Sequence, residues 1–144
     1  MICEYSSEQL ESCAKLFVKT FNSSPWNDEW SMERAKKYLK EITDTPRFVG
    51  FTLWKSGEVI GVAFCHAVTW WDGDELFIDE FFVSYEYQRH GYGGMIMNSV
   101  VEYCENNSLK SISLMTSNHM PSNEFYIRNG FSISAGMRMF YRKI

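Results

Sequence analysis

The sequence is poor in the patterns that would indicate a metal site, a membrane span or a nucleic-acid interface. Its three histidines are scattered and its four cysteines form no C-x-x-C pair, so the usual zinc and dithiol motifs are absent. No apolar run approaches the ~20 residues that a membrane helix needs, and the first residues show no signal-peptide pattern. The formal net charge is -4, which makes a phosphate backbone an unfavourable partner. We therefore expect a cytoplasmic protein with no metal, membrane or nucleic-acid partner.

The composition fits one domain with a complete core. A hydrophobic content of 45% in 144 residues is enough to fill such a core, and no repeat or low-complexity linker divides the chain. We expect a single domain over residues 1–144. The cysteines lie in apolar segments and are predicted to be buried free thiols.

Hydrophobic periodicity predicts the order of helices and strands. Apolar residues at helical spacing predict helices over residues 10–21, 32–42, 95–105 and 122–129. Runs rich in β-branched and aromatic residues predict strands over residues 1–5, 48–54, 59–68, 75–83 and 111–116, and a closing hairpin over 131–134 and 137–143. Hairpins combined with one strand–helix–strand crossover predict an α+β (α/β/α) fold. Its central sheet should be mixed and mostly antiparallel, with helices on both faces.

A glycine-rich stretch separates the strand over 75–83 from the helix that follows it. It reads Gln88-Arg89-His90-Gly91-Tyr92-Gly93-Gly94. A turn of this kind presents several backbone N–H groups at a helix N-terminus, where the helix dipole also favours negative charge. The stretch therefore predicts a site for the pyrophosphate of a nucleotide-containing cofactor. A plain helix-capping turn is the alternative.

Two well-known phosphate loops do not fit this stretch. A P-loop requires lysine and then serine or threonine after the last glycine, but Met95 follows Gly94. A dinucleotide fingerprint requires a third glycine three residues after Gly93, where Ile96 stands. The cofactor is therefore expected to be neither a triphosphate bound by a Walker motif nor a dinucleotide.

Two motifs in the chain resemble those of the GCN5-related N-acetyltransferases, the GNAT superfamily. Gln88-x-x-Gly91-x-Gly93 is similar to the family's Q/R-x-x-G-x-G/A loop. The stretch 123–131 resembles a later motif, a short helix that carries a tyrosine, here Tyr126, and ends in Gly-Phe. The element order resembles the family fold over essentially the whole chain. More loosely, Pro25-Trp26 and the strand with Glu80 are similar to the branch that includes aminoglycoside 6′-N-acetyltransferases.

The resemblance implies a GNAT-like acyl-CoA N-acyltransferase fold and acetyl-CoA as co-substrate. Backbone groups at 81–83 would meet the pantetheine arm and the thioester carbonyl, and Gln88 would bond a phosphate or brace the loop. Arg89 and His90 would add charge, or simply be solvated. The predicted cofactor-binding residues are Phe81, Phe82, Val83, Gln88, Arg89, His90, Gly91, Tyr92, Gly93, Gly94 and Asn118.

Acetyl transfer to an amine requires two proton transfers, one from the attacking amine and one to the leaving thiolate. An alkyl ammonium has a pKa near that of lysine, about 10.4, so it must lose a proton before it attacks. Glu80 is the predicted base and Asp79 the alternative. Because neighbours in a strand face opposite sides, we expect only one of them to enter the cleft. Either could instead only bind the cation. By resemblance, Tyr126 gives a proton to the leaving thiolate, with a core aromatic as the alternative reading.

Acidic residues beside tryptophans predict where a cation binds. Such groupings occur at 26–30 and 70–74, and they suit a cationic ligand through charge and cation–π contacts. The alternative is that the tryptophans cover the edge of the core. The predicted substrate-binding residues are Trp26, Asp28, Trp71 and Asp79.

Together, these features predict direct transfer of the acetyl group of acetyl-CoA to a primary amine of a small cationic substrate in a ternary complex. A peptide or protein amine as acceptor, and a non-catalytic acyl-CoA-binding sensor, stay open as alternatives. The sequence also leaves open the acceptor, the length of the acyl group and whether the protein is a homodimer.

Overall fold

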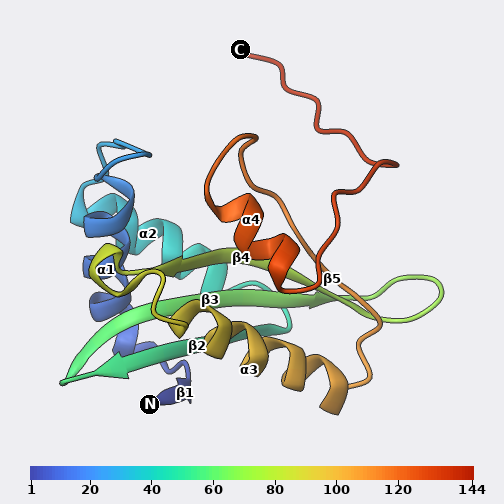
Figure 1. Cartoon of the computed structure of the whole chain (residues 1–144), viewed down its shortest axis with the longest axis horizontal. Coiled ribbons are helices and arrows are strands. Elements are labelled where there is room, and N and C mark those ends of the chain that lie inside the picture. Colours follow the sequence, from blue (N-terminus) through green and yellow to red (C-terminus); the bar gives the residue numbers. More distant parts are fainter.

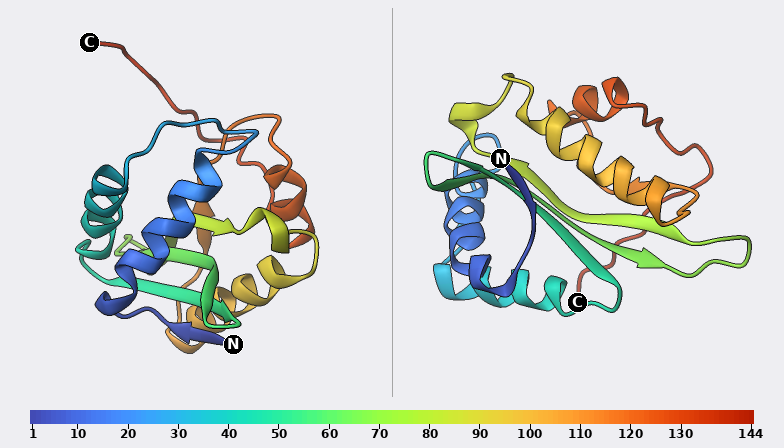
Figure 2. Two further views of the ribbon diagram at one scale, coloured as in Figure 1. Left: turned by 90° about the vertical axis from the view of Figure 1, so that its left-hand side faces the viewer. Right: turned by 90° about the horizontal axis from the view of Figure 1, so that it is seen from below.

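A five-stranded sheet runs through the middle of the protein, with helices on both of its faces (Figures 1 and 2). The computed structural model describes all of residues 1–144. The strands are β1 (Ile2–Glu4), β2 (Phe48–Lys55), β3 (Glu58–Val68), β4 (Glu75–Val83) and β5 (Ile112–Leu114). The helices are α1 (Leu10–Phe21), α2 (Met32–Thr43), α3 (Tyr92–Asn106) and α4 (Ser122–Arg128), with short 3-10 turns at Ser7–Gln9 and Tyr85–Tyr87. The predicted fold class is confirmed.

The strands follow one another across the sheet in chain order. β1 to β4 pair antiparallel. The two helices α1 and α2 lie between β1 and β2 in the chain, and short loops join β2 to β3 and β3 to β4. β5 pairs parallel to β4 after the chain has crossed over through α3. A parallel pair needs such a crossover, because the chain must return to the same end of the sheet. The mixed, mostly antiparallel sheet that the sequence predicts is therefore present.

Each face of the sheet has its own apolar core. α1 and α2 cover one face, where Phe17 and Leu39 pack with Phe64 and Phe82. α3 covers the other face, where apolar residues of β2, β3 and β4 pack against Ile96, Met97, Val100 and Cys104. Cys13, Cys65 and Cys104 are buried and Cys3 is partly buried, and all four are free thiols. None of the helices has the length and apolar character that crossing a bilayer requires.

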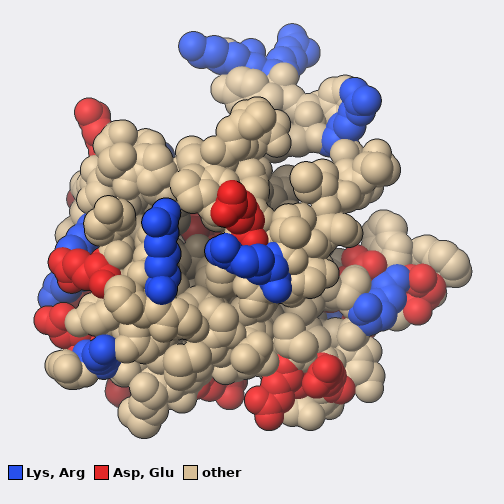
Figure 3. Space-filling view, in the orientation of Figure 1, with Lys and Arg blue, Asp and Glu red and all other residues tan.

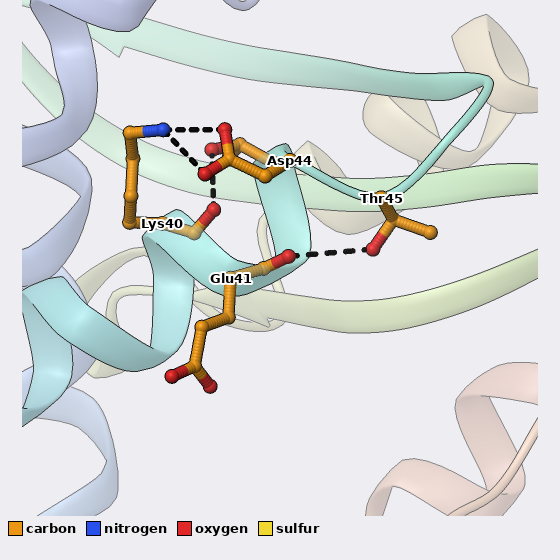
Figure 4. A network of polar contacts seen from close by, with 5 residues as sticks. Lys40, Glu41, Asp44 and Thr45 are labelled. Atoms are coloured by element: carbon orange, nitrogen blue, oxygen red, sulfur yellow. Dashed lines mark hydrogen bonds and ion pairs between the residues drawn. The ribbon is translucent and has the colours of Figure 1, made fainter.

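α2 is fixed at both ends by local hydrogen bonds. At its start, the backbone N–H of Arg34 donates to Ser31 Oγ over 3.1 Å, which caps the helix. At its end, Lys40 forms an ion pair with Asp44, and the hydroxyl of Thr45 donates to the carbonyl of Glu41 (Figure 4). These bonds stabilise the two ends of the helix that carries Tyr38, whose hydroxyl bonds Glu80.

A β-bulge interrupts the pairing of β3 with β4. Glu80 lies opposite Phe64 and Ile78 lies opposite Cys65, so Asp79 has no partner in the ladder. An extra residue of this kind changes the alternation of side chains along the bulged strand. The alternation of β4 side chains between the two faces of the sheet is therefore shifted after the bulge relative to before it.

The predicted hairpin over 131–134 and 137–143 is wrong. Phe131 is the last residue with a backbone hydrogen bond to the rest of the chain, from its N–H to the carbonyl of Tyr126. Residues 132–144 form no strand and make no hydrogen bond, and they project from the body (Figures 1 and 2). A two-stranded hairpin without a neighbouring strand or a packed face is only marginally stable, so its alternating pattern alone does not form it.

Candidate active site

The site lies where β4 and β5 separate. Their pairing ends at Ile78 and Leu114, and beyond it no strand pairs with that edge of β4. A cavity of about 230 Å³ opens at this point. It is lined by Phe21, Trp26, Ile78, Asp79, Glu80, Phe81, Leu114, Met115, Thr116, Ser117, Ser122 and Tyr126. A second hollow of about 290 Å³ near the end of α2 contains none of the predicted site residues.

Glu80 is the most strongly buried carboxylate of this cavity. Burial raises its pKa to about 7, and the nearby charge of Asp79 raises it as well. The hydroxyl of Tyr38 donates to Glu80 Oε1 over 2.5 Å, which favours the ionised form and opposes that rise. A carboxylate with a pKa near neutrality is suited to accept and release a proton under physiological conditions.

Asp79 lines the same cavity and is paired with a histidine. Its Oδ2 lies 2.7 Å from His66 Nδ1 on the neighbouring strand β3. Burial raises the pKa of Asp79, while the bond to His66 opposes the rise. The expectation that only one of Asp79 and Glu80 can enter the cleft is therefore wrong. It assumed regular alternation, which the bulge in β4 breaks.

Tyr38 is a polar partner of Glu80 that the sequence did not reveal. It lies on α2, stacks on Trp30 with ring centroids 5.3 Å apart, and also contacts Phe17. Burial and the charge of Glu80 raise its pKa above the ordinary value, so its hydroxyl stays protonated and can only donate to the carboxylate. In the sequence it belongs to the apolar stripe of a helix, which indicates a core residue and gives no sign of a polar partner.

Tyr126 enters the cavity from α4. Its ring packs among aromatic residues, with centroids 6.3 Å from Phe81 and 5.7 Å from Phe131. Its hydroxyl makes no hydrogen bond within the protein, although burial and the charge of Glu80 raise its pKa to about 12. The side chain is therefore a protonated donor at neutral pH, on the same cavity as a carboxylate that can be ionised.

The side chain of Gln88 braces the glycine-rich stretch. Its Nε2 donates to the carbonyl of Val83 over 3.0 Å, which joins the start of the loop to the end of β4. Arg89 and Gly91 adopt positive φ angles of 62° and 85°. At Gly93, an added Cβ would lie only 3.0 Å from the ring of Phe125 on α4. The loop is thus fixed against both β4 and the helix that carries Tyr126.

The backbone N–H groups of Arg89 to Gly94 find no acceptor within the protein. The first bond into α3 runs from Met95 to the carbonyl of Gly91, and no side chain caps this end of the helix. Six successive unpaired donors beside the positive end of a 15-residue helix make a site for an anion. A plain capping turn, the alternative, likewise leaves the first N–H groups of its helix unpaired.

Of the predicted substrate-binding residues, two reach the cavity. Trp26 and Asp79 line it. Asp28 instead accepts from the indole Nε1 of Trp30 over 3.1 Å and lies outside the cavity. Trp71 is 86% exposed on the loop between β3 and β4 and is not part of the cavity either. Of the four residues, Trp26 and Asp79 therefore lie at the cavity, whereas Asp28 and Trp71 do not.

The remaining predicted cofactor-binding residues lie around the cavity in different settings. Phe81 lines it, whereas the side chains of Phe82 and Val83 are buried in the cores on the two faces, so only their backbones are available. The hydroxyl of Tyr92 accepts a bond from Lys55 Nζ over 2.6 Å. Asn118 is exposed and makes no hydrogen bond. Arg89 and His90 are exposed in the loop.

Comparison with known proteins identifies the family of the chain. The sequence profile of the acetyltransferase (GNAT) family matches residues 10–131. No curated protein sequence gives a significant match.

Solved structures with low sequence identity share the fold over nearly the whole chain. A probable acetyltransferase superposes with a TM-score of 0.82 at 14% identity, covering 100% of this chain and 97% of its own. An integron cassette protein from the mobile metagenome of V. cholerae gives 0.84 at 13% identity, covering 99% and 91%. An aminoglycoside acetyltransferase from an uncultured soil metagenomic sample, solved with trehalose, gives 0.77 at 13% identity, covering 100% and 95%. The family profile spans most of the chain, and the protein therefore belongs to the acetyltransferase (GNAT) family.

Proposed function

We propose that the protein transfers the acetyl group of acetyl-CoA to a primary amine of a small cationic substrate, by direct attack in a ternary complex. The observation that carries this proposal is the meeting of Glu80 and Tyr126 on one cavity. One is a carboxylate with a pKa of about 7, and the other is a hydroxyl without a partner in the protein. These are the two groups that an amine and a leaving thiolate require.

The residues around the cavity fit acetyl-CoA. The six unpaired N–H groups from Arg89 to Gly94 are suited to its pyrophosphate, because they combine hydrogen-bond donors with the helix dipole. The edge of β4 from Phe81 to Val83 has no strand beside it, so its backbone is free to bond the amide groups of the pantetheine arm. Asn118 is a further donor on the loop after β5. Acetyl-CoA would supply the acetyl group as a thioester.

Glu80 would accept the proton that the amine must lose. The C–N bond forms as the C–S bond breaks. The reaction therefore needs one group that accepts the proton from nitrogen and another that donates a proton to the leaving sulfur. The carboxylate of Glu80 accepts the proton from nitrogen, directly or through a water. The hydroxyl of Tyr126 supplies a proton to the sulfur, and it is available for this because nothing in the protein accepts its bond.

The two carboxylates of the cavity support a cationic substrate. Asp79 and Glu80 are neighbours at the bulge, and the aromatic residues Phe21 and Trp26 line the same cavity. An alkyl ammonium gains both from the negative charge and from the aromatic faces. The aminoglycoside acetyltransferase that shares the fold, 13% identical to this chain, was also solved in complex with sisomicin. Aminoglycosides and polyamines are therefore the first acceptors to test.

A thiol-release assay with acetyl-CoA tests this proposal. Aminoglycosides, polyamines, amino acids and peptides are compared at equal concentration, and the acetylated product is identified by mass spectrometry. We expect release of CoA thiol to depend on a small cationic amine. Turnover with peptides alone would indicate a protein amine acetyltransferase. Tight binding of acetyl-CoA without turnover on any amine would indicate a sensor. Both outcomes would contradict the proposal.

Replacing Tyr38 with phenylalanine is expected to shift the pH dependence of kcat/KM to higher pH. The base must be ionised, so kcat/KM of the wild type should rise as pH passes through about 7. The bond from Tyr38 lowers the pKa of Glu80. Its loss removes that stabilisation of the carboxylate, so the rising limb moves upward. A pH profile of each enzyme from pH 5.5 to 9, a range of about 1.5 units or more on each side of that value, measures the shift.

The matched control is Tyr103→Phe, which removes a hydroxyl from a partly buried tyrosine of α3 that packs on Phe51, outside the cavity. Its pH profile should coincide with that of the wild type. A Tyr38→Phe profile that also coincides would show that the bond to Glu80 does not govern the titration of the base.

A further inference from the structure

The loop between α1 and α2, residues 22–31, lies at the surface except for two of its side chains. All of its residues are exposed apart from Trp26 and Trp30, which are partly buried. Trp26 lines the cavity of the candidate site, whereas Trp30 stacks on Tyr38, whose hydroxyl bonds Glu80. One exposed loop therefore contacts both the cavity and the residue that bonds the proposed base.

The side chain of Asn22 joins the two ends of this loop. Its Nδ2 donates to the carbonyl of Trp30 over 2.9 Å, and the backbone N–H of Trp30 donates to its Oδ1 over 2.8 Å. The N–H of Asp28 also donates to the carbonyl of Phe21 over 2.8 Å. An amide that bonds both backbone groups of one residue fixes the orientation of that residue as well as its position. Asn22 therefore determines how Trp30 enters the body of the protein.

The indole ring of Trp30 is held on several sides. Its centroid lies 5.3 Å from that of Tyr38, with 29° between the ring planes, and 5.0 Å from that of Phe17, with 78° between the planes. Its Nε1 donates to Asp28 Oδ2 over 3.1 Å. Stacked and edge-to-face arrangements of this kind are the favourable ones for aromatic pairs. The ring of Tyr38 thus packs on an indole that is itself fixed.

Glu80 depends on Tyr38 more than on any other side chain. It accepts one hydrogen bond, from the hydroxyl of Tyr38, and no basic side chain pairs with it. The other titratable groups around it are Asp79 on β4, Tyr126 on α4 and, bonded to Asp79, His66 on β3. A hydrogen bond weakens steeply as its angle departs from linear, so a tilt of the Tyr38 ring would weaken the one bond that Glu80 has.

The loop contributes no positive charge that could replace this bond. It contains the acids Asp28 and Glu29 and no basic residue. In Figure 3 an acidic side chain stands out at the upper left, where Figure 1 shows this loop. A nearby positive charge is what would stabilise an ionised carboxylate directly. The loop can therefore favour ionised Glu80 through the position of Tyr38 and not through charge.

We propose that Asn22 and Trp30 are positioning residues, which hold the hydroxyl of Tyr38 on the carboxylate of Glu80. Asn22 fixes Trp30, Trp30 supports the ring of Tyr38, and Tyr38 donates to Glu80. The importance of this chain of contacts for catalysis rests on the proposed function, whereas the contacts themselves do not.

Direct titration of Glu80 tests the proposal without an activity assay. The carboxyl carbon is followed by NMR in protein labelled with ¹³C-glutamate, and its signal is identified by its absence from Glu80→Gln. The wild-type midpoint should lie at about 7. Trp30→Leu and Asn22→Ala should each raise it, by up to about one pH unit, the size expected when a hydrogen bond to a charged group is lost. In a Tyr38→Phe background neither should raise it further, because the bond is already absent.

Matched variants separate positioning from a general loss of packing. Trp54→Leu removes another partly buried tryptophan from the same apolar core, but its indole bonds within β2. Ser24→Ala changes an exposed side chain of the loop that makes no hydrogen bond. Both should leave the midpoint unchanged, and Trp30→Phe, which keeps a stacking ring, should restore most of it. Circular dichroism verifies that each variant is folded. A wild-type midpoint in Trp30→Leu and Asn22→Ala, or an equal rise in the Tyr38→Phe background, would overturn the proposal.

Kinetics with the best amine then links the contacts to catalysis. The rising limb of kcat/KM should move with the NMR midpoint in Trp30→Leu, while the plateau at high pH stays near that of the wild type. A lower plateau with an unmoved limb would show a structural role only and would contradict the proposal. Absence of turnover on any amine would contradict the proposed function, while the NMR titration would still decide the role of Asn22 and Trp30.

Discussion

Replacing Glu80 with glutamine is expected to reduce kcat/KM for the amine by about 10²-fold or more at pH 7, the usual contribution of a positioned base. Glutamine keeps the size of the side chain and can still accept the bond from Tyr38, so the packing around α2 should survive. What it cannot do is take a proton. The rising limb of the pH profile near 7 should therefore disappear together with the activity. Steady-state kinetics with the best amine of the panel measures both effects.

The control for this variant is Glu75→Gln, at the start of the same strand. Glu75 pairs with Lys110 at the surface and lies outside the cavity, so kcat/KM should not change. If Glu80→Gln retained full activity with an unaltered pH profile, Glu80 would not be the base. A large rise in KM at unchanged kcat would instead make it a binding group for the cation.

Replacing Tyr126 with phenylalanine is expected to lower kcat by about 10²-fold while KM for the amine stays nearly constant. The ring keeps its contacts with Phe81 and Phe131, and the hydroxyl has no partner in the protein whose loss could disturb the fold. In the proposed mechanism, the hydroxyl becomes important only when charge develops on the leaving sulfur. Removing it therefore costs transition-state stabilisation and little ground-state binding.

Two measurements separate a role in the chemistry from a role in binding or packing. Calorimetric titration of acetyl-CoA should give the same affinity for Tyr126→Phe as for the wild type, because the pyrophosphate is expected at the loop after β4. Tyr103→Phe, outside the cavity, should leave kcat unchanged. A Tyr126→Phe enzyme with wild-type kcat would remove the tyrosine from the chemistry and leave it as a packing residue.

Most of the fold could be predicted because its elements have strong local patterns. α2 is an example, since a serine cap precedes it and apolar residues recur at helical spacing through Ile42. The turn before α3 could be predicted in the same way, because its glycines directly precede an apolar helical pattern. Both features depend on neighbours in the chain, which a single sequence contains.

The bulge at Asp79 could not be predicted, and the arrangement of the two carboxylates depends on it. Regular alternation places Asp79 and Glu80 on opposite faces, whereas the extra residue lets both reach one cavity. A bulge is a property of two paired strands, and the sequence of β4 alone does not predict it. The same limit hid Tyr38, whose partner Glu80 is 42 residues away in the chain.

The end of the chain shows the opposite error. The residues after Phe131 have a strand-like pattern, and the pattern was taken to mean a hairpin within the chain. Strand propensity states what a segment can join, but it does not name the partner.

Transfer of an isotopically labelled acetyl group tests the central claim most directly. The protein is incubated with labelled acetyl-CoA, first alone and then with the best amine of the panel. Mass spectrometry then measures the masses of the intact protein and of the amine. Burial raises the pKa of the Cys65 thiol, the cysteine nearest the site, well above its usual range, so it is not expected to form an acyl-enzyme. Direct attack predicts an unlabelled protein in both cases and label on the amine nitrogen, in equal amount to the thiol released. Label retained on the protein, or no transfer to any cationic amine, would contradict the account.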